Sequence, residues 1–224
     1  MALRILTWNL RHGRSLPPSG RDLRTEFADA LAGWSWDVAL LQEVPPWWPP
    51  ELGRRLGADF RLVLTSRNSL LPLRRAIAVR SPDLIKSNGG GANAILVRHQ
   101  AILVRRSLRL RILPERRWLL GAMLEGGTWV GTLHATVRNE PAAVAEAQLA
   151  GRTLLGWAGL APVALGGDFN VRALSLPGLE LAAGHDVDLV FARGLGTSSE
   201  VEVLERGSLS DHAPVAVTLG RRGG

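Results

Sequence analysis

The sequence contains no cysteine, and this absence removes several classes of protein from consideration. Without thiols there is no disulfide scaffold, no cysteine-ligated zinc, no iron–sulfur cluster and no cysteine nucleophile. Hydrophobic residues make up 46% of the 224 residues and charged residues 21%, a balance that lets the chain bury a core without covalent support. We therefore expect one globular domain over residues 1–220 and a disordered tail over residues 221–224.

Long apolar runs are also missing. No segment approaches the ~20 consecutive apolar residues that a membrane-spanning helix needs. The first ten residues, MALRILTWNL, lack the basic region, the long apolar region and the small-residue cleavage site of a signal peptide, and they resemble a first strand instead. We therefore expect a cytoplasmic, monomeric protein with no stable membrane insertion.

Lysine is almost absent, although the chain is basic. Lys86 is the single lysine among 27 basic residues, and the net charge is +7. A basic chain favours partners that carry phosphate, such as nucleic acid or anionic lipid. The arginines are scattered along the chain, and a genome that readily encodes arginine would give the same excess. Composition alone leaves both explanations open.

Short strands account for most of the pattern, and two segments have helical periodicity. Apolar residues from Leu23 to Trp34 fall on one stripe of a helix. A second helix is expected from an N-cap at Asn139 through Leu155, with Pro141 in its first turn. Many strands and few helices indicate packed sheets with helices outside. The expected strands are Leu3–Trp8, Val38–Gln42, Arg61–Leu64, Ala76–Val79, Ala94–Val97, Trp118–Leu124, Trp129–Leu133, Val163–Leu165, Val187–Phe191, Val201–Leu204 and Pro214–Leu219.

One spacing occurs twice along the chain. Asn9 and Glu43 each follow a strand, lie 34 residues apart and have a predicted helix between them, and the same is true of His134 and Asp168. A strand–helix–strand unit of this length fits a parallel crossover, in which both strands end at the same edge of the sheet. Sites in such sheets form at that edge. We therefore expect each pair to converge, and all four side chains to meet if the two units face each other.

The last three predicted strands are spaced like a meander. In a meander the first and third strands start at the same edge of one sheet. This arrangement places Asp188, at one strand start, close to Asp211 and His212 at the other.

These polar residues form a set with a recognisable chemistry. Carboxylate and amide oxygens are hard ligands that suit Mg²⁺ or Mn²⁺, and the histidines lack the spacing of a zinc site. A divalent cation with imidazoles and amides nearby is typical of phosphoryl transfer. The set consists of Asn9, Glu43, His134, Asp168, Asn170, Asp188, Asp211 and His212.

At these residues the sequence resembles the endonuclease/exonuclease/phosphatase superfamily, which has the DNase I-like fold. The matching segments follow the family's order over nearly the whole chain. The resemblance implies an α+β fold, a four-layer α/β/β/α sandwich of two packed mixed sheets flanked by helices. The matching segments are TWNLR at 7–11, LLQEV at 40–44, GANAILVR at 91–98, TLHAT at 132–136, GGDFN at 166–170, VDLVF at 187–191 and SDHAPV at 210–215.

The resemblance also implies a cofactor and its ligands. Glu43 would be the principal ligand of Mg²⁺ or Mn²⁺, with Asn9 and Asp211 at or near the cation. Arg11 matches a family position that contacts phosphate, and Asn93 matches an asparagine that faces substrate. The resemblance implies these roles because each residue stands at the position of the corresponding family motif.

Catalytic roles follow from the same resemblance. Asp168 would orient or deprotonate the attacking water, and Asn170 would hold phosphate. His212 would pair with Asp188, which fixes its tautomer. His134 would stabilise the transition state or protonate the leaving oxygen. Whether Asp168 or His212 is the formal base remains open at this stage.

Some residues have simpler interpretations. His12, His99 and His185 are interpreted as loop residues without a role in the site. Trp47 and Trp48 either pack on the body of the protein as part of a rigid loop, or stack on a base or enter a lipid interface. The glycine-rich stretch from Asn88 to Asn93 is either a mobile loop at the cleft or a plain turn.

The function indicated first is a divalent-cation-dependent phosphodiester hydrolase, a nuclease acting on DNA or RNA. The alternative is a phosphatase or phosphodiesterase acting on a lipid or small-molecule phosphate ester, since the same site chemistry serves both. A second alternative is a non-catalytic, phosphate-binding relic of the fold. The chain has no tyrosine, which disfavours the abasic-site endonucleases of the superfamily because they use an active-site tyrosine.

Overall fold

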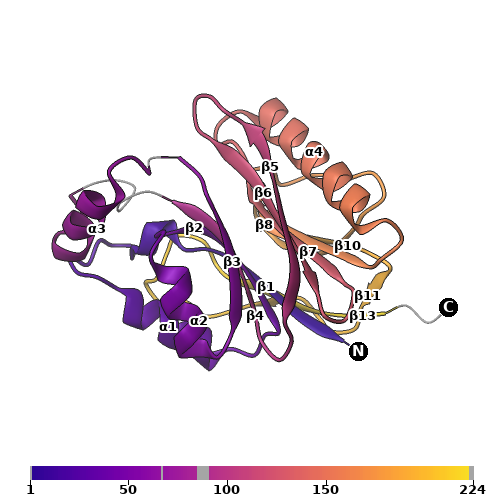
Figure 1. Cartoon of the computed structure of the whole chain (residues 1–224), viewed down its shortest axis with the longest axis horizontal. Coiled ribbons are helices and arrows are strands. Elements are labelled where there is room, and N and C mark those ends of the chain that lie inside the picture. Colours follow the sequence, from indigo (N-terminus) through magenta and orange to yellow (C-terminus); the bar gives the residue numbers. More distant parts are fainter. Residues whose placement is uncertain (1, 67, 85–90, 222–224) are drawn as a thin grey trace.

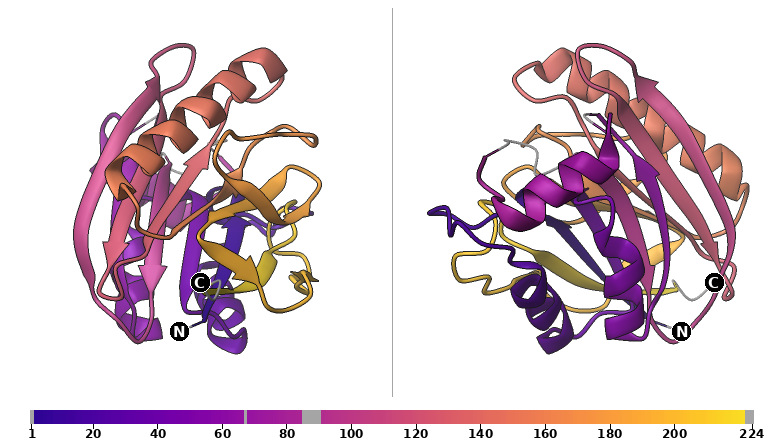
Figure 2. Two further views of the ribbon diagram at one scale, coloured as in Figure 1. Left: turned by 90° about the vertical axis from the view of Figure 1, so that its right-hand side faces the viewer. Right: turned by 60° about the vertical axis from the view of Figure 1, so that its left-hand side comes forward.

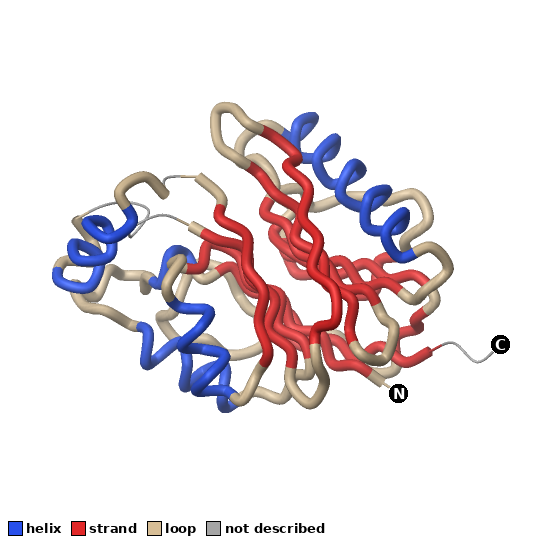
Figure 3. The backbone as a smooth tube through the Cα atoms, viewed as in Figure 1, coloured by secondary structure: helices blue, strands red, loops and turns tan. Residues whose placement is uncertain are grey.

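A computed structural model describes residues 2–66, 68–84 and 91–221. Two mixed β-sheets pack face to face and helices cover their outer faces (Figures 1 and 3), which confirms the predicted four-layer sandwich. Among the described residues no helix is both long and apolar enough to cross a membrane. The helices are α1 (Arg24–Gly33), α2 (Trp48–Leu56), α3 (Leu71–Arg80) and α4 (Glu140–Ala158), with a 3-10 turn, η1, at Arg11–Gly13.

The first sheet has the strand order β11-β13-β1-β2-β4-β3, with β12 paired to β13, and the second has the order β5-β6-β7-β8-β10-β9. The parallel pairs β1–β2 and β7–β8 are the two predicted crossover units. The strands are β1 (Leu3–Asn9), β2 (Val38–Val44), β3 (Asp59–Leu64), β4 (Ala92–Val97), β5 (Ile102–Arg111), β6 (Arg117–Leu124), β7 (Trp129–His134), β8 (Val163–Asp168), β9 (Glu180–His185), β10 (Asp188–Arg193), β11 (Leu195–Thr197), β12 (Glu202–Val203) and β13 (Val215–Arg221).

Three apolar clusters hold the layers together. One lies between the sheets and includes Ile5 and Val190, the second joins the first sheet to α1 and α2 around Trp8 and Phe27, and the third joins the second sheet to α4 around Leu154. The side views in Figure 2 show α4 across one outer face and α1 with α2 at the other. Alternating strand residues therefore face two different cores, which fixes each strand's register.

Both predicted helices are present. The Asn139 side chain caps α4 by accepting a hydrogen bond from the backbone N–H of Ala142, as predicted. The expected strand Ala76–Val79 is wrong, because these residues belong to α3. Helix α2 begins within the proline-rich stretch, for which a rigid loop is one of the two interpretations. Both unexpected helices carry proline in the first turn, where its missing N–H costs no intrahelical bond.

The predicted meander is also wrong. β10 pairs with β8 and β9 in the second sheet, whereas β12 and β13 pair with each other in the first. The glycine-rich stretch from Asn88 to Asn93, expected to be either a mobile loop or a plain turn, lies partly outside the described residues, which leave out residues 85–90. Its last two residues, Ala92 and Asn93, belong to β4. Of the predicted tail, Arg221 ends β13 and residues 222–224 lie outside the described part of the chain.

Candidate active site

The ends of β1 and β2 supply the first two polar side chains of the site. The strands are parallel, and Asn9 lies opposite Gln42 in their register. An irregularity in the pairing of β2 with β4 falls between Leu41 and Val44, and Glu43 within it has a φ of 50°. A bulge at the end of a sheet changes the direction in which a side chain points. At this bulge the Glu43 carboxylate lines a cleft.

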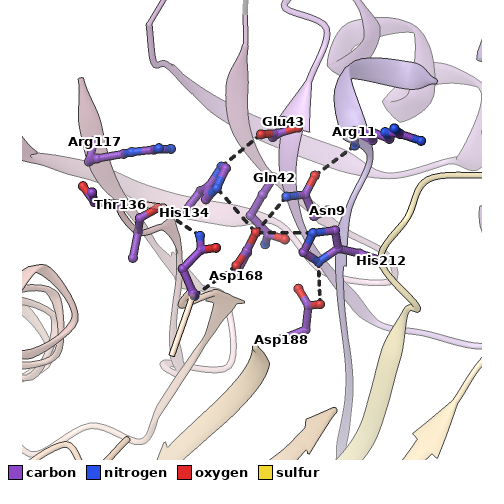
Figure 4. Close-up of polar contacts among 12 residues, drawn as sticks. Asn9, Arg11, Gln42, Glu43, Arg117, His134, Thr136, Asp168, Asp188 and His212 are labelled. Atoms are coloured by element: carbon purple, nitrogen blue, oxygen red, sulfur yellow. Dashed lines mark hydrogen bonds and ion pairs between the residues drawn. The ribbon is translucent and has the colours of Figure 1, made fainter. Parts of the chain in front are cut away.

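The ends of β7 and β8 supply the second pair. His134 lies directly opposite Asp168. Across the sandwich, Nδ1 of His134 lies 3.6 Å from a carboxylate oxygen of Glu43, and its Nε2 lies 3.4 Å from Asp168 (Figure 4). The Asn9 amide donates a 2.9 Å hydrogen bond to Asp168. The two pairs spaced 34 residues apart therefore converge as expected.

Asp188 and His212 also meet, although their strands lie in different sheets. Nδ1 of His212 lies 2.7 Å from Oδ2 of Asp188, and its Nε2 lies 3.8 Å from Asp168. The indole N–H of Trp8 donates to the backbone carbonyl of His212. The Ser210 hydroxyl donates to the carbonyl of Asn9 and accepts from the N–H of His212, which ties this loop to β1.

The remaining predicted residues occupy different positions around this centre. The Arg11 guanidinium lies 3.3 Å from Asp211, and the Arg11 backbone N–H donates to Oδ1, the side-chain amide oxygen of Asn9. The Asn170 amide donates to the carbonyl of Ala135, and its backbone N–H donates to Asp168. A cleft of about 610 Å³ is lined by Asn9, Arg11, His12, Arg14, Glu43, His134, Val137, Arg138, Asp168, Asn170, Asp211 and His212.

Asn93 differs from the other predicted residues. Its side chain is only 1% exposed, it donates to the backbone carbonyl of Trp118 on β6, and it is not part of the cleft lining. Its side-chain oxygen is buried and has no hydrogen-bond partner among the residues that the structure describes. A substrate-facing role for Asn93 therefore stays a prediction.

Burial is the main cause of the raised pKa values of two carboxylates in the site. It raises the pKa of Glu43 to about 7, although the positive charge of His212 acts to lower it. Burial and the neighbouring charge of Asp188 raise the pKa of Asp168 to about 7 as well. A carboxylate with a pKa near the working pH is suited to accept a proton from water.

The two histidines are pushed in opposite directions. Burial lowers the pKa of His212, but the hydrogen bond and charge of Asp188 outweigh it and raise that pKa to about 9. Burial, together with the charge of Arg117, lowers the pKa of His134 well below its usual value. Near neutral pH His212 is therefore a cation paired with Asp188, whereas His134 is neutral and carries a proton on one ring nitrogen only.

The donor set fits a divalent cation. The half-buried Glu43 carboxylate lines the cleft, and a bound dication would favour its charged form. The Asn9 oxygen already accepts from Arg11 but keeps a second lone pair. Asp168, Asp188 and His212 also offer ligand atoms within 4.8 Å of one another. In that cluster His212 is bonded to Oδ2 of Asp188, whereas Oδ1 of Asp188 is buried with no hydrogen-bond partner among the described residues, so this cluster is a second candidate position for the cation.

Sequence reasoning missed three residues around this centre. His12, interpreted as a loop residue, lies 3.3 Å from Glu43. Arg117 is buried, pairs with Glu115 and extends toward Glu43 and His134 (Figure 4). Gln42 donates from between the sheets to hydroxyls on β1 and β7. The position of His12 near the site could have been predicted from the sequence, since it lies three residues beyond Asn9 in the loop that follows the same strand.

The two tryptophans of the proline-rich stretch have separate surroundings. Trp48 is 2% exposed and packs against Phe27, as the body-packing interpretation expects. Trp47 is partly buried and lines a separate, mainly apolar pocket of about 430 Å³ with Pro46, Leu71 and other residues of α3. Within the described part of the chain, its indole N–H is buried and has no hydrogen-bond partner.

Comparison with known proteins agrees with this geometry. Residues 6–212 match the model described as the Endonuclease/Exonuclease/phosphatase family. A search of curated proteins gave no significant match.

Solved structures share the fold at low sequence identity. The human Nocturnin catalytic domain with bound sulfate anion is 18% identical, with 99% of this chain and 95% of that chain covered and a TM-score of 0.75. An endonuclease/exonuclease/phosphatase from Beutenbergia cavernae DSM 12333 is also 18% identical, with 99% and 72% covered and a TM-score of 0.72. A D. rerio TDP2 humanized by 14 mutations is 16% identical, with 98% and 99% covered and a TM-score of 0.70.

Proposed function

The chain belongs to the endonuclease/exonuclease/phosphatase family, whose fold indicates a phosphoric ester hydrolase, and we propose that it is a divalent-cation-dependent phosphodiester hydrolase acting on DNA or RNA. The observation that carries the proposal is Asp168. Its carboxylate is buried, has a pKa of about 7 and receives hydrogen bonds from Asn9 and Asn170. This group is held in place and is able to take a proton at neutral pH.

The cation would be held by Glu43, with Asp211 and Asn9 beside it. When bound, a divalent cation neutralises charge on phosphate oxygens and lowers the barrier to attack at phosphorus. The Arg11 guanidinium, 3.3 Å from Asp211, holds that carboxylate and offers further N–H groups to a phosphate at the cleft.

In the proposed step a water oxygen forms a bond to phosphorus while the opposite ester bond breaks. The proton of the attacking water passes to Asp168, and the leaving oxygen takes a proton from solvent. The His212 cation donates from Nε2 to a non-bridging phosphate oxygen and balances the charge that develops there. Neutral His134 donates a hydrogen bond to the same phosphate, a role that its lowered pKa favours over proton transfer to the leaving oxygen.

Nucleic acid is favoured as substrate by the basic charge of the chain and by the arginines around the cleft. Arg11, Arg14 and Arg138 line it, and the net charge is +7. Positive charge at a groove attracts a polyanion and raises its local concentration.

A second candidate, a lipid or small-molecule phosphate ester, is favoured by a different surface. On and beside α3, Leu70 is 73% exposed and Leu73 is 58% exposed, next to the apolar pocket of Trp47. Exposed apolar side chains close to arginines are typical of surfaces that contact anionic lipid. A non-catalytic relic is disfavoured because four of the five predicted catalytic residues line one cleft, and the fifth, Asp188, is hydrogen-bonded to one of them, His212.

The test is an activity screen with Mg²⁺ or Mn²⁺ over plasmid DNA, single-stranded DNA, RNA, a phosphoinositide and sphingomyelin. The Asp168→Asn variant serves as the inactive control. We expect cleavage of a nucleic acid that EDTA and this substitution both abolish. Turnover of the lipid substrates alone would select the second candidate, and full activity in excess EDTA would contradict the cation mechanism.

A further inference from the structure

The turn that follows β1 places a histidine beside the proposed cation ligand. Nε2 of His12 lies 3.3 Å from Oε2 of Glu43, and the two side chains are 15% and 23% exposed. Both residues line the same cleft. The proposed function assigns no role to His12.

The position of His12 is imposed by the surrounding structure. Arg11 and His12 both have positive φ, at 47° and 54°, a conformation that costs free energy outside glycine. Gly13 follows with its N–H bonded to the carbonyl of Leu10, and a Cβ at Gly13 would lie 2.3 Å from the buried ring of Trp48. Packing therefore keeps the turn closed and keeps the imidazole facing the site.

The 3.3 Å separation suits two ligands of one ion. Two donor atoms, each about 2.1 Å from an octahedral cation, lie about 3.0 Å apart when they occupy neighbouring positions. At a tetrahedral cation with similar bond lengths the separation is about 3.4 Å. The observed distance falls between these values, so one cation could contact both atoms without a backbone change.

We infer that His12 is a nitrogen ligand of the cation that Glu43 holds. This inference rests on the proposed function, because it assumes a cation at Glu43. It adds that the site is a mixed imidazole–carboxylate site. Imidazole binds transition-metal ions better than Mg²⁺, which prefers oxygen donors and its own water. The site should therefore discriminate in favour of ions such as Co²⁺ over Mg²⁺.

The competing explanation is that His12 only holds the Glu43 carboxylate in place. A positioning residue would affect every cation alike, and no nitrogen would contact the ion. His134 is a second possible nitrogen donor, because its Nδ1 lies 3.6 Å from the other Glu43 oxygen. The experiment therefore has to separate His12 from His134 and ligation from positioning.

The informative variant is His12→Asn, because asparagine tolerates positive φ and offers an oxygen but no ring nitrogen. The matched control is His99→Asn, since His99 has a φ of 64° and is exposed in the turn between β4 and β5. Binding of Co²⁺ and Mg²⁺ is measured by calorimetry without substrate. Ligation of Mn²⁺ is measured by electron spin-echo modulation, which detects a directly bound ¹⁴N.

We expect His12→Asn to weaken Co²⁺ binding at least about tenfold and Mg²⁺ binding less than about threefold. The ¹⁴N modulation should be present in the wild type and in His99→Asn and absent in His12→Asn. If the modulation persists in His12→Asn, or if this substitution weakens the binding of Co²⁺ and of Mg²⁺ by the same factor, the inference is wrong. Loss of modulation in His134→Asn but not in His12→Asn would assign the nitrogen to His134. If neither cation binds the wild type, the proposed cation mechanism itself fails.

Discussion

The Asp188 carboxylate and the His212 imidazole lie 2.7 Å apart although they come from different sheets. Asp188 begins β10 of the second sheet, and His212 precedes β13 of the first. The pair therefore joins the two halves of the sandwich at the cleft. The negative charge of Asp188 raises the pKa of His212 to about 9, so the imidazole is cationic where phosphate would bind.

This pair should act as a unit in turnover. His212→Ala and Asp188→Asn should each reduce kcat by about 10²–10³-fold, the usual cost of losing one preorganised group that stabilises developing charge. Residues that act together are not additive, so the double variant should be little worse than the worse single variant. A double-mutant cycle at saturating cation measures this. Two large effects that simply multiply would show that the residues act independently.

The pH profile should be bell-shaped. kcat/KM should rise with pH as Asp168 ionises, at or below its pKa of about 7 because a bound cation favours the carboxylate. It should fall as His212 loses its proton near pH 9. In Asp188→Asn both limbs should move to lower pH, because the charge of Asp188 raises both pKa values. An unchanged alkaline limb would remove His212 from the mechanism.

The sequence could predict the parallel pairs because their determinants are local. A strand, a helix and a second strand with polar residues at both strand ends define a crossover, and the registers place Asn9 opposite Gln42 and His134 opposite Asp168. The convergence of the site follows from these registers once the two sheets face each other.

Pairing between distant strands could not be predicted in this way. The final strands had the spacing of a meander, yet β10 pairs with β8. This pairing depends on contacts between segments far apart in the sequence, which local patterns do not reveal. Asp188 and His212 still meet, because the two sheets present the relevant strand ends at the same end of the sandwich. The strand predicted at Ala76–Val79 is a helix, because its aliphatic residues fit either structure and Pro72 lies in the first turn of the helix, where proline is favoured.

Contacts made by turns were equally inaccessible to sequence reasoning. The proximity of His12 to Glu43 depends on a left-handed turn and on the ring of Trp48. The position of Glu43 next to His134 depends on a bulge in β2. Neither irregularity has a signature in hydrophobic periodicity.

The turn can be tested with two glycines that have similar positive φ. Gly13 and Gly20 have φ of 75° and 71°, but an added Cβ meets Trp48 at 2.3 Å at Gly13, whereas at Gly20 it meets no atom of the described residues within 4 Å. Gly13→Ala should lower the free energy of unfolding by about 1–3 kcal/mol more than Gly20→Ala, because overpacking adds to the shared φ strain. Urea unfolding compares the two. Equal losses would show that Trp48 does not hold the turn.

Cation binding should stabilise the folded protein through Glu43. At a concentration 100-fold above Kd, a ligand that binds only the folded state adds about 2.7 kcal/mol. Mn²⁺ should therefore raise the Tm of the wild type and of the control Glu140→Gln, which changes an exposed residue at the start of α4. Glu43→Gln should show little or no rise, because it lowers the ligand charge. An equal rise in Glu43→Gln would place the cation elsewhere, with the Asp168–Asp188–His212 cluster as the next candidate.

The arginines at the cleft should determine how salt affects nucleic-acid binding. Each phosphate that a protein neutralises contributes about 0.9 to the log–log salt slope for duplex DNA and about 0.7 for single strands. Arg138 is exposed and lines the cleft, whereas Arg152 is exposed on α4 and is not part of its lining. In the Asp168→Asn background, which prevents cleavage, Arg138→Gln should reduce the slope by roughly one phosphate contact, and Arg152→Gln should leave it unchanged.

Fluorescence anisotropy with labelled oligonucleotides over a salt series measures both slopes. Equal slopes in the two variants would remove Arg138 from the interface. A wild type insensitive to salt that turns over a lipid phosphoester would make the lipid substrate the better-supported one, because neutralising a polyanion necessarily releases counterions.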